Sequence, residues 1–215
     1  MRSAEFHRAC AVLDAQPFII DYPDGASCGL SGAGGRVLDL LGEASLRPLV
    51  GVITHAPHGN ERSHPQHIAC FDEMQRSCAD RAIPFGFFSE IPSPGYEADG
   101  ESRVNDRVRH AGVSVRWPVL MRPELEAITQ SPLHPGRYLR AVRRWRYLRP
   151  QFVALTRMFR IDIDLPRKQQ LLDLYPSQIS GMKEYDTYRR STEYLYADRR
   201  LSDALFPLFL QCPAS

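Results

Sequence analysis

Residues 54–67 read Thr-His-Ala-Pro-His-Gly-Asn-Glu-Arg-Ser-His-Pro-Gln-His and hold four of the chain's seven histidines. The residues just before them, 49–54, are mostly apolar and β-branched, which favours a short buried strand. Ser63 and Gln66 have the spacing of a capping box, and Pro65 suits a first helical turn, so a helix is predicted after them. The order of strand, polar loop and helix places the histidines at the carboxyl end of a strand, where open α/β sheets bind ligands.

Two of these histidines, His64 and His67, stand three residues apart on the predicted first helical turn, so both rings can point to one side. The free backbone amides of a helix start favour an anion or a developing negative charge. An imidazole ligand beside an imidazole donor therefore suits metal-assisted hydrolysis of an acyl group. A second interpretation stays open, because surface histidines are common in loops near prolines. A catalytic zinc also takes three protein ligands, so the remaining ligands must come from elsewhere.

The motif of residues 54–67 resembles that of the PIG-L/LmbE-like family of metal-dependent N-deacetylases. Those proteins carry Thr-His-Asn-Pro, and then Gly-Glu-Tyr-Gly-His-Pro-(Asp/Glu/Gln)-His, at the end of a strand. Two weaker matches follow in the expected order. Arg2, Glu5 and the Pro-Asp-Gly of residues 23–25 resemble the family's Arg-x-x-Glu helix and the loop after it. Lys168, the Tyr-Pro-Ser-Gln of residues 175–178 and Glu193 resemble its closing signature.

The chain departs from the family pattern in two ways. Arg62 and Ser63 stand where Tyr and Gly are expected, in a loop one residue longer than usual. The family's opening His-Pro-Asp-Asp-Glu motif, which supplies two metal ligands and the general base, is absent from the sequence. The other His-Pro, at residues 134–135, is followed by Gly and Arg. The chain thus resembles a family member that lacks its N-terminal segment. Three explanations are open: a misassigned start codon, a natural truncation, or a partner that supplies the missing segment.

The resemblance implies a three-layer Rossmann-like α/β fold with a mostly parallel sheet and a C-terminal extension of strands and helices. In that scheme residues 1–95 form a partial Rossmann-like deacetylase core. Residues 96–215 form the C-terminal part of the same domain, with strands, a basic helix and the closing helices. The implied reaction is hydrolysis of an N-acetyl group from an amino sugar or its conjugate, with a divalent metal, usually zinc, activating water.

The resemblance also implies roles for six residues. His64 would be the catalytic oxyanion donor and His67 a metal ligand. Arg2 and Asp24 would contact the sugar, and His55 and Glu61 would shape the loop. Asp24 fits a plain turn residue equally well. A lone imidazole cannot hold catalytic zinc in the family's way, so little or no deacetylase activity is expected from this exact chain. A catalytically inactive sugar- or partner-binding homologue is the second hypothesis, and it predicts sugar affinity without metal or turnover.

Composition describes an ordinary globular chain of 215 residues, with 43% hydrophobic and 24% charged residues. A net charge of +2 provides no global electrostatic case for nucleic acid or a membrane surface. No apolar run reaches membrane-spanning length and the N-terminus lacks a signal-peptide pattern. The five cysteines lack both disulfide-framework and zinc-ribbon spacing, which indicates reduced thiols and a cytoplasmic protein. A homo-oligomer stays open.

Two other stretches have a functional and a structural interpretation. Residues 137–149 carry six arginines among aromatic residues, which suits an anion or nucleic acid. Their helical spacing equally predicts a helix with a solvated basic face, and the small net charge favours this interpretation. Nucleic-acid binding is therefore the weakest hypothesis. The glycine-rich residues 29–35 lack the Gly-Lys-Ser/Thr ending of a phosphate loop and predict a flexible loop instead.

The remaining elements are predicted from apolar periodicity and turn residues. Strands are expected at residues 17–21, 83–88, 112–117 and 159–164, and a surface loop at 91–100. Short helices are expected around residues 37–41 and from Lys168 onward.

Overall fold

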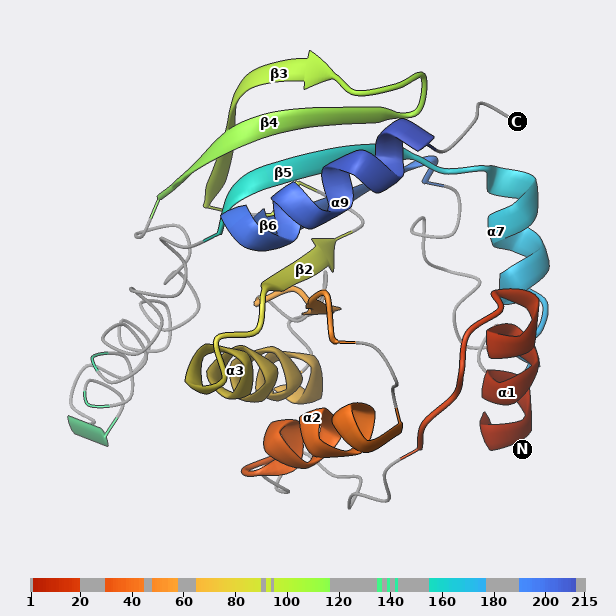
Figure 1. The fold of residues 1–215 in the computed structure, drawn as a ribbon, viewed down its shortest axis with the longest axis vertical. Helices are drawn as coiled ribbons and strands as arrows, with labels where there is room; N and C mark the ends of the chain where they lie inside the picture. The colour runs from red at the N-terminus through yellow and green to blue at the C-terminus, as the bar shows by residue number, and fades with distance from the viewer. Residues whose placement is uncertain are drawn as a thin grey trace.

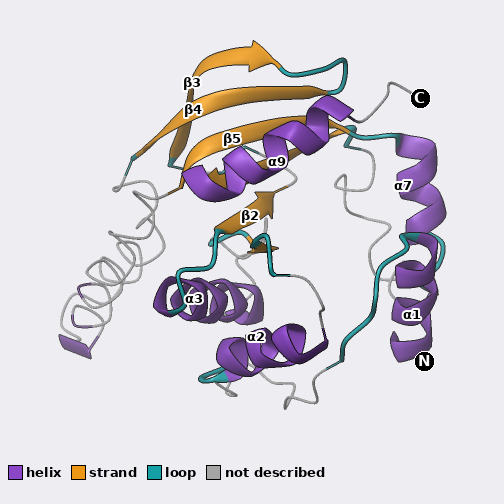
Figure 2. Cartoon of the chain, in the orientation of Figure 1, coloured by secondary structure: helices purple, strands orange, loops and turns teal. Residues whose placement is uncertain are grey.

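The computed structural model describes residues 2–19, 30–44, 48–57, 65–89, 92–93, 95–116, 135–136, 139, 142, 155–176 and 190–211. The helices of these ranges are α1 (Arg2–Val12), α2 (Ala33–Ala44), α3 (Pro65–Asp80), α7 (Leu165–Leu172) and α9 (Arg199–Gln211). The strands are β1 (Val52–His55), β2 (Phe85–Ser89), β3 (Tyr96–Arg103), β4 (Val108–Val115), β5 (Leu155–Asp162) and β6 (Thr192–Asp198). Figure 1 shows their arrangement along the chain and Figure 2 shows the same view by type of element.

The six described strands form one sheet in the order β1-β2-β6-β5-β4-β3. β1 and β2 are parallel, whereas β2–β6, β6–β5, β5–β4 and β4–β3 are antiparallel. The predicted mixed α/β class is confirmed, but the mostly parallel, Rossmann-like sheet is wrong. The physical reason is connectivity. A parallel pair needs a long crossover such as α3, which joins β1 to β2, whereas β3 and β4 are joined by a short turn that makes them antiparallel.

Strand β3 occupies the second half of the stretch, residues 91–100, that was predicted to be a surface loop. Its residues after Tyr96 are exposed, and Glu97, Asp99 and Glu101 are among them. Charged side chains suit an edge strand because they disfavour pairing with another chain. The hairpin partner β4 fixes its register, with Tyr96 opposite Val115. The polar composition that predicted a loop is therefore that of a solvated sheet edge.

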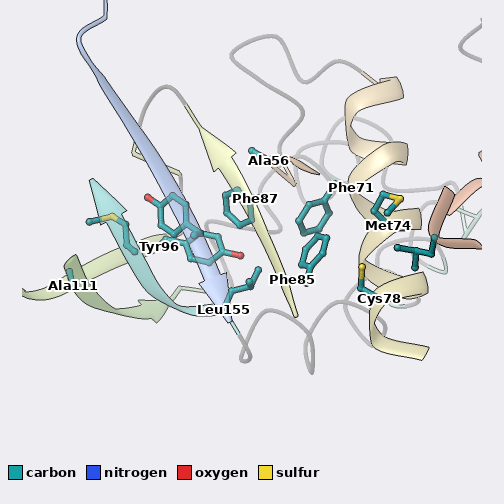
Figure 3. Packing of buried hydrophobic residues seen from close by; sticks show 12 residues of the cluster. Ala56, Phe71, Met74, Cys78, Phe85, Phe87, Tyr96, Ala111 and Leu155 are labelled. Carbon is teal, nitrogen blue, oxygen red and sulfur yellow. The ribbon is translucent and has the colours of Figure 1, made fainter. Parts of the chain in front are cut away.

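The main core lies between α3 and one face of the sheet. Phe71 of α3 is fully buried, and its ring centroid lies 5.7 Å from those of Phe85 and Phe87 on β2. Phe87 in turn stacks on Tyr196 of β6 with centroids 4.8 Å apart. Figure 3 shows the rings of Phe71, Phe85 and Phe87 between the helix and the strands. Because aromatic side chains bury large areas and pack in edge-to-face pairs, this cluster fixes α3 against the sheet.

Helix α9 packs on the opposite face of the sheet. A Cβ at Gly86 would lie 2.8 Å from Leu201 Cδ2, so this face of β2 touches the start of α9. Farther along, three partly buried side chains of α9 pack on the buried Val108, Phe159 and Leu195 of the strands: Leu205, Phe206 and Phe209. Helices therefore cover both faces of the sheet around β2 and β6.

Residues 33–35 of the glycine-rich stretch form the start of α2 and not a loop, whereas residues 30–32 precede the helix. A Cβ at Gly34 would lie 2.5 Å from Ser77 Oγ and 2.9 Å from the Glu73 carbonyl oxygen, so glycine lets α2 approach α3 closely. Glu73 Oε1 also accepts the Gly32 backbone N–H at 2.8 Å. The Glu73 carboxylate thus accepts a backbone N–H of the kind that binds a phosphate group at the start of a helix.

Other predicted elements agree with the structure with shifted ends. The helix around residues 37–41 is confirmed as part of α2, and the strands at 83–88, 112–117 and 159–164 correspond to β2, β4 and β5. The helix near Lys168 begins earlier, because Asp164 caps α7 by accepting the Arg167 backbone N–H. The strand at residues 17–21 is not formed over its described part, 17–19.

Candidate functional site

The predicted strand and helix bring two of the named histidines together. β1 ends at His55, and His67 lies in the first turn of α3. Their rings stack face to face, with centroids 4.2 Å apart and planes 3° from parallel. The Phe88 ring on β2 lies 5.7 Å from that of His55 and is tilted by 48°. We call His67, His55 and Phe88 the ring cluster.

The parallel pairing of β1 and β2 explains this arrangement. His55 lies opposite Phe88 in the register, so both side chains stand near the carboxyl ends of neighbouring parallel strands. Thr54 points the other way, because side chains alternate along a strand. Its hydroxyl is buried and lies 3.5 Å from Cys70 Sγ of α3. The strand is thus anchored through Thr54, while His55 and His67 are half-buried and Phe88 is exposed.

The ring geometry limits how the ring cluster can hold a metal. Zinc binds about 2.0–2.1 Å from an imidazole nitrogen, in the direction of its in-plane lone pair. Since the two imidazole planes are parallel and stacked, one zinc ion cannot lie in both planes at that distance. Across the described residues, no group of three His, Cys, Asp or Glu side chains could hold a metal ion. The described residues therefore do not complete a zinc site by themselves.

The other predicted site residues are distributed differently. His64, Asp24 and Glu61 lie outside the described residues. Arg2 is the first residue of α1. The structure thus pairs the predicted metal ligand His67 with the predicted loop-shaping residue His55, as a direct ring stack that sequence reasoning did not anticipate.

The two weaker family-like matches contain residues that lie close together in the structure. Lys168 Nζ of α7 lies 2.9 Å from Glu193 Oε1 of β6, so two members of the closing signature form an ion pair. Burial raises the pKa of the Tyr175 hydroxyl, and Cys10 and Glu5 of α1 raise it further. Tyr175, just after α7, therefore lies near α1, and Figure 1 shows these two helices together on one side of the sheet. Ser177 and Gln178 lie outside the described residues.

Phe88 is the member of the ring cluster that sequence reasoning missed as a site residue. The strand prediction for residues 83–88 placed it at a strand end, which is a usual position for functional side chains. Two consecutive phenylalanines, Phe87 and Phe88, must also face opposite sides of a strand. Without the pairing of β1 and β2, however, nothing linked Phe88 to His55.

The predicted basic helix is represented by few described residues. Leu139 and Val142 are 57% and 43% exposed, and the arginines of this stretch lie outside the described residues. None of the helices described is long and apolar enough to span a lipid bilayer. Comparisons with protein-family models, with curated proteins and with solved structures found no match for this chain.

Proposed function

We propose that the ring cluster belongs to an N-deacetylase site that hydrolyses the N-acetyl group of an amino sugar or its conjugate. The observation that carries the proposal is the stack of His55 on His67 where β1 ends and α3 begins. The motif around these residues resembles that of the PIG-L/LmbE-like N-deacetylases, in which the position of His67 binds the metal. A bound zinc would supply Lewis acidity and an activated water.

The described residues have their own parts in this proposal. The first backbone amides of α3 carry the positive end of the helix dipole, which favours the negative charge that develops on an amide oxygen during hydrolysis. His55 is a positioning residue, because its ring covers one face of the His67 imidazole and restricts its rotation. His64, outside the described residues, is the proposed oxyanion donor.

The sequence limits the rate that this proposal allows. It contains no His-Pro-Asp-Asp-Glu motif, and the described residues include no group of three side chains that could hold the metal, whereas catalytic zinc takes three protein ligands. Slow turnover is therefore expected. The same observation favours a second candidate function, a sugar-binding homologue without catalysis.

Acetate release separates the two functions. The assay incubates concentrated protein with zinc and methyl N-acetyl-β-glucosaminide, and compares the wild type with His67→Ala. His7→Ala is the matched control, because His7 is an exposed imidazole of α1. The proposal predicts acetate release by the wild type and His7→Ala and a background rate for His67→Ala. Equal rates in all three proteins would contradict it, and sugar binding without acetate release would favour the binding function.

A further inference from the structure

Phe88 is an exposed aromatic residue at the end of a strand within the sheet. Its side chain is 40% exposed, whereas its neighbour Phe87 is fully buried in the core. The two therefore have different environments, since Phe87 packs on Phe71 and Tyr196 and thereby holds the sheet to α3. Phe88 does not belong to the main core cluster of buried residues between α3 and the sheet.

The backbone around Phe88 is held on both sides. β2 pairs with β1 on one side, where Phe88 is opposite His55, and with β6 on the other, where Phe88 is opposite Leu195. Leu195 is buried. Side chains presented by paired strands are placed more accurately than those on loops. Phe88 is thus a partly exposed aromatic side chain on a rigid support.

The exposed ring continues directly into the candidate site. His55 contacts Phe88 with ring centroids 5.7 Å apart and stacks on His67 at 4.2 Å. The three rings therefore form a row from β2 through β1 to the start of α3. On the same face, Ile53 is opposite Gly86 and is 46% exposed, which extends the apolar surface beside Phe88.

This arrangement fits one class of ligand. A pyranose ring has a face of C–H groups and a rim of hydroxyls, so it matches a flat aromatic surface bordered by polar rings. An aromatic side chain also loses little conformational freedom when it binds, because it has two rotatable bonds. We propose that Phe88 is the stacking platform for the sugar ring and that it directs the acetamido group along the row of rings toward His67.

The inference rests on the proposed function for the identity of the sugar, and a binding measurement tests it independently of turnover. The probe is methyl N-acetyl-β-glucosaminide, and its dissociation constant is measured by calorimetry for the wild type and three variants of Phe88. Phe88→Tyr keeps the ring, Phe88→Leu keeps an apolar side chain without the flat face, and Phe88→Ala removes both. Leu208→Ala, at a 52% exposed position of α9, is the matched control.

The platform predicts a graded result. Phe88→Ala and Phe88→Leu should weaken binding about fivefold, as expected for the loss of one aromatic stack. Phe88→Tyr and Leu208→Ala should bind within about twofold of the wild type. Thermal melting of each variant checks that the fold is intact.

The outcomes separate this inference from the proposed function. Ring-dependent binding without acetate release would support the platform and contradict the deacetylase proposal. If the wild type releases acetate but Phe88→Ala binds the glycoside with the same dissociation constant as the wild type, the deacetylase proposal is supported and the platform is contradicted. Loss of affinity in Phe88→Ala but not in Phe88→Leu would show a general apolar contact and overturn stacking. Failure of the wild type to bind the glycoside would also overturn the platform.

Discussion

Asp198 accepts a hydrogen bond from the backbone N–H of Phe85, with Oδ2 and the nitrogen 2.9 Å apart. Its other carboxylate oxygen, Oδ1, accepts the Leu201 N–H at 2.7 Å, at the start of α9. One side chain therefore joins the end of β6 to the beginning of β2 and to the first turn of α9. This link fixes the strand that carries Phe88 relative to the rest of the sheet.

Asp198→Ala should lower the free energy of unfolding by about 2 kcal/mol, because it removes a helix cap and leaves a strand N–H without its acceptor. Urea denaturation followed by circular dichroism measures this change. Asp173→Ala is the control, since Asp173 makes an exposed hydrogen bond to Gln169 and should cost less than about 0.5 kcal/mol. Equal losses of unfolding free energy in the two variants would show that the hydrogen bonds of Asp198 do not stabilise the fold more than an exposed surface contact.

Phe71→Ala should destabilise the protein by about 3–5 kcal/mol, the usual cost of removing a buried phenylalanine. Phe71 has no exposed surface and packs on Phe85 and Phe87, so the substitution leaves a cavity between α3 and the sheet. Chemical denaturation of Phe71→Ala and Phe88→Ala side by side provides the comparison. Phe88→Ala should cost much less, and similar losses for both would contradict the described packing.

Stability should also depend on pH through His110 of β4. Its ring lies 4.9 Å from Phe159 and 5.7 Å from Phe206, and Nε2 is 3.5 Å from Ser202 Oγ. Burial lowers the pKa of His110 below its ordinary 6.5, Arg157 lowers it further, and Asp203 opposes them. The folded state thus binds fewer protons than the unfolded state.

The sign of the effect follows from this lowered pKa. The contribution of His110 is complete above its ordinary pKa of 6.5 and is lost as the pH falls through the lower folded value. Melting temperatures at pH 7.5, 6.5 and 5.5 should therefore decrease for the wild type. His110→Phe, which cannot be protonated, should show a smaller decrease. An identical pH profile for both proteins would rule out a contribution from His110.

The local structure around the histidines could be predicted from sequence, because each signal is short-range. The β-branched run before His55 predicts the strand, and Pro65 before His67 suits the first turn of the helix that follows. The presence of both histidines at one site followed from that order. The face-to-face stack did not, since it depends on side-chain orientations that the motif does not specify.

The sheet could not be predicted because its pairing is non-local. β6, near the end of the chain, lies between β2 and β5 and is antiparallel to both. No local pattern determines which strand takes that place. β3 was missed because its exposed polar side chains resemble those of a loop, and its hydrogen bonds come from β4. Phe88 was missed for the same reason, because its neighbour His55 is set by the register of β1 and β2.

The most direct test of the proposed deacetylase site is the zinc content of purified protein after loading with zinc and desalting, measured by elemental analysis. We expect close to one zinc per chain in the wild type and in the His7→Ala control, and loss of the zinc in His67→Ala. The remaining ligands would come from residues outside the described ranges or from a second subunit. A wild type without zinc, or a His67→Ala variant that keeps it, would contradict the assignment of His67 as a metal ligand.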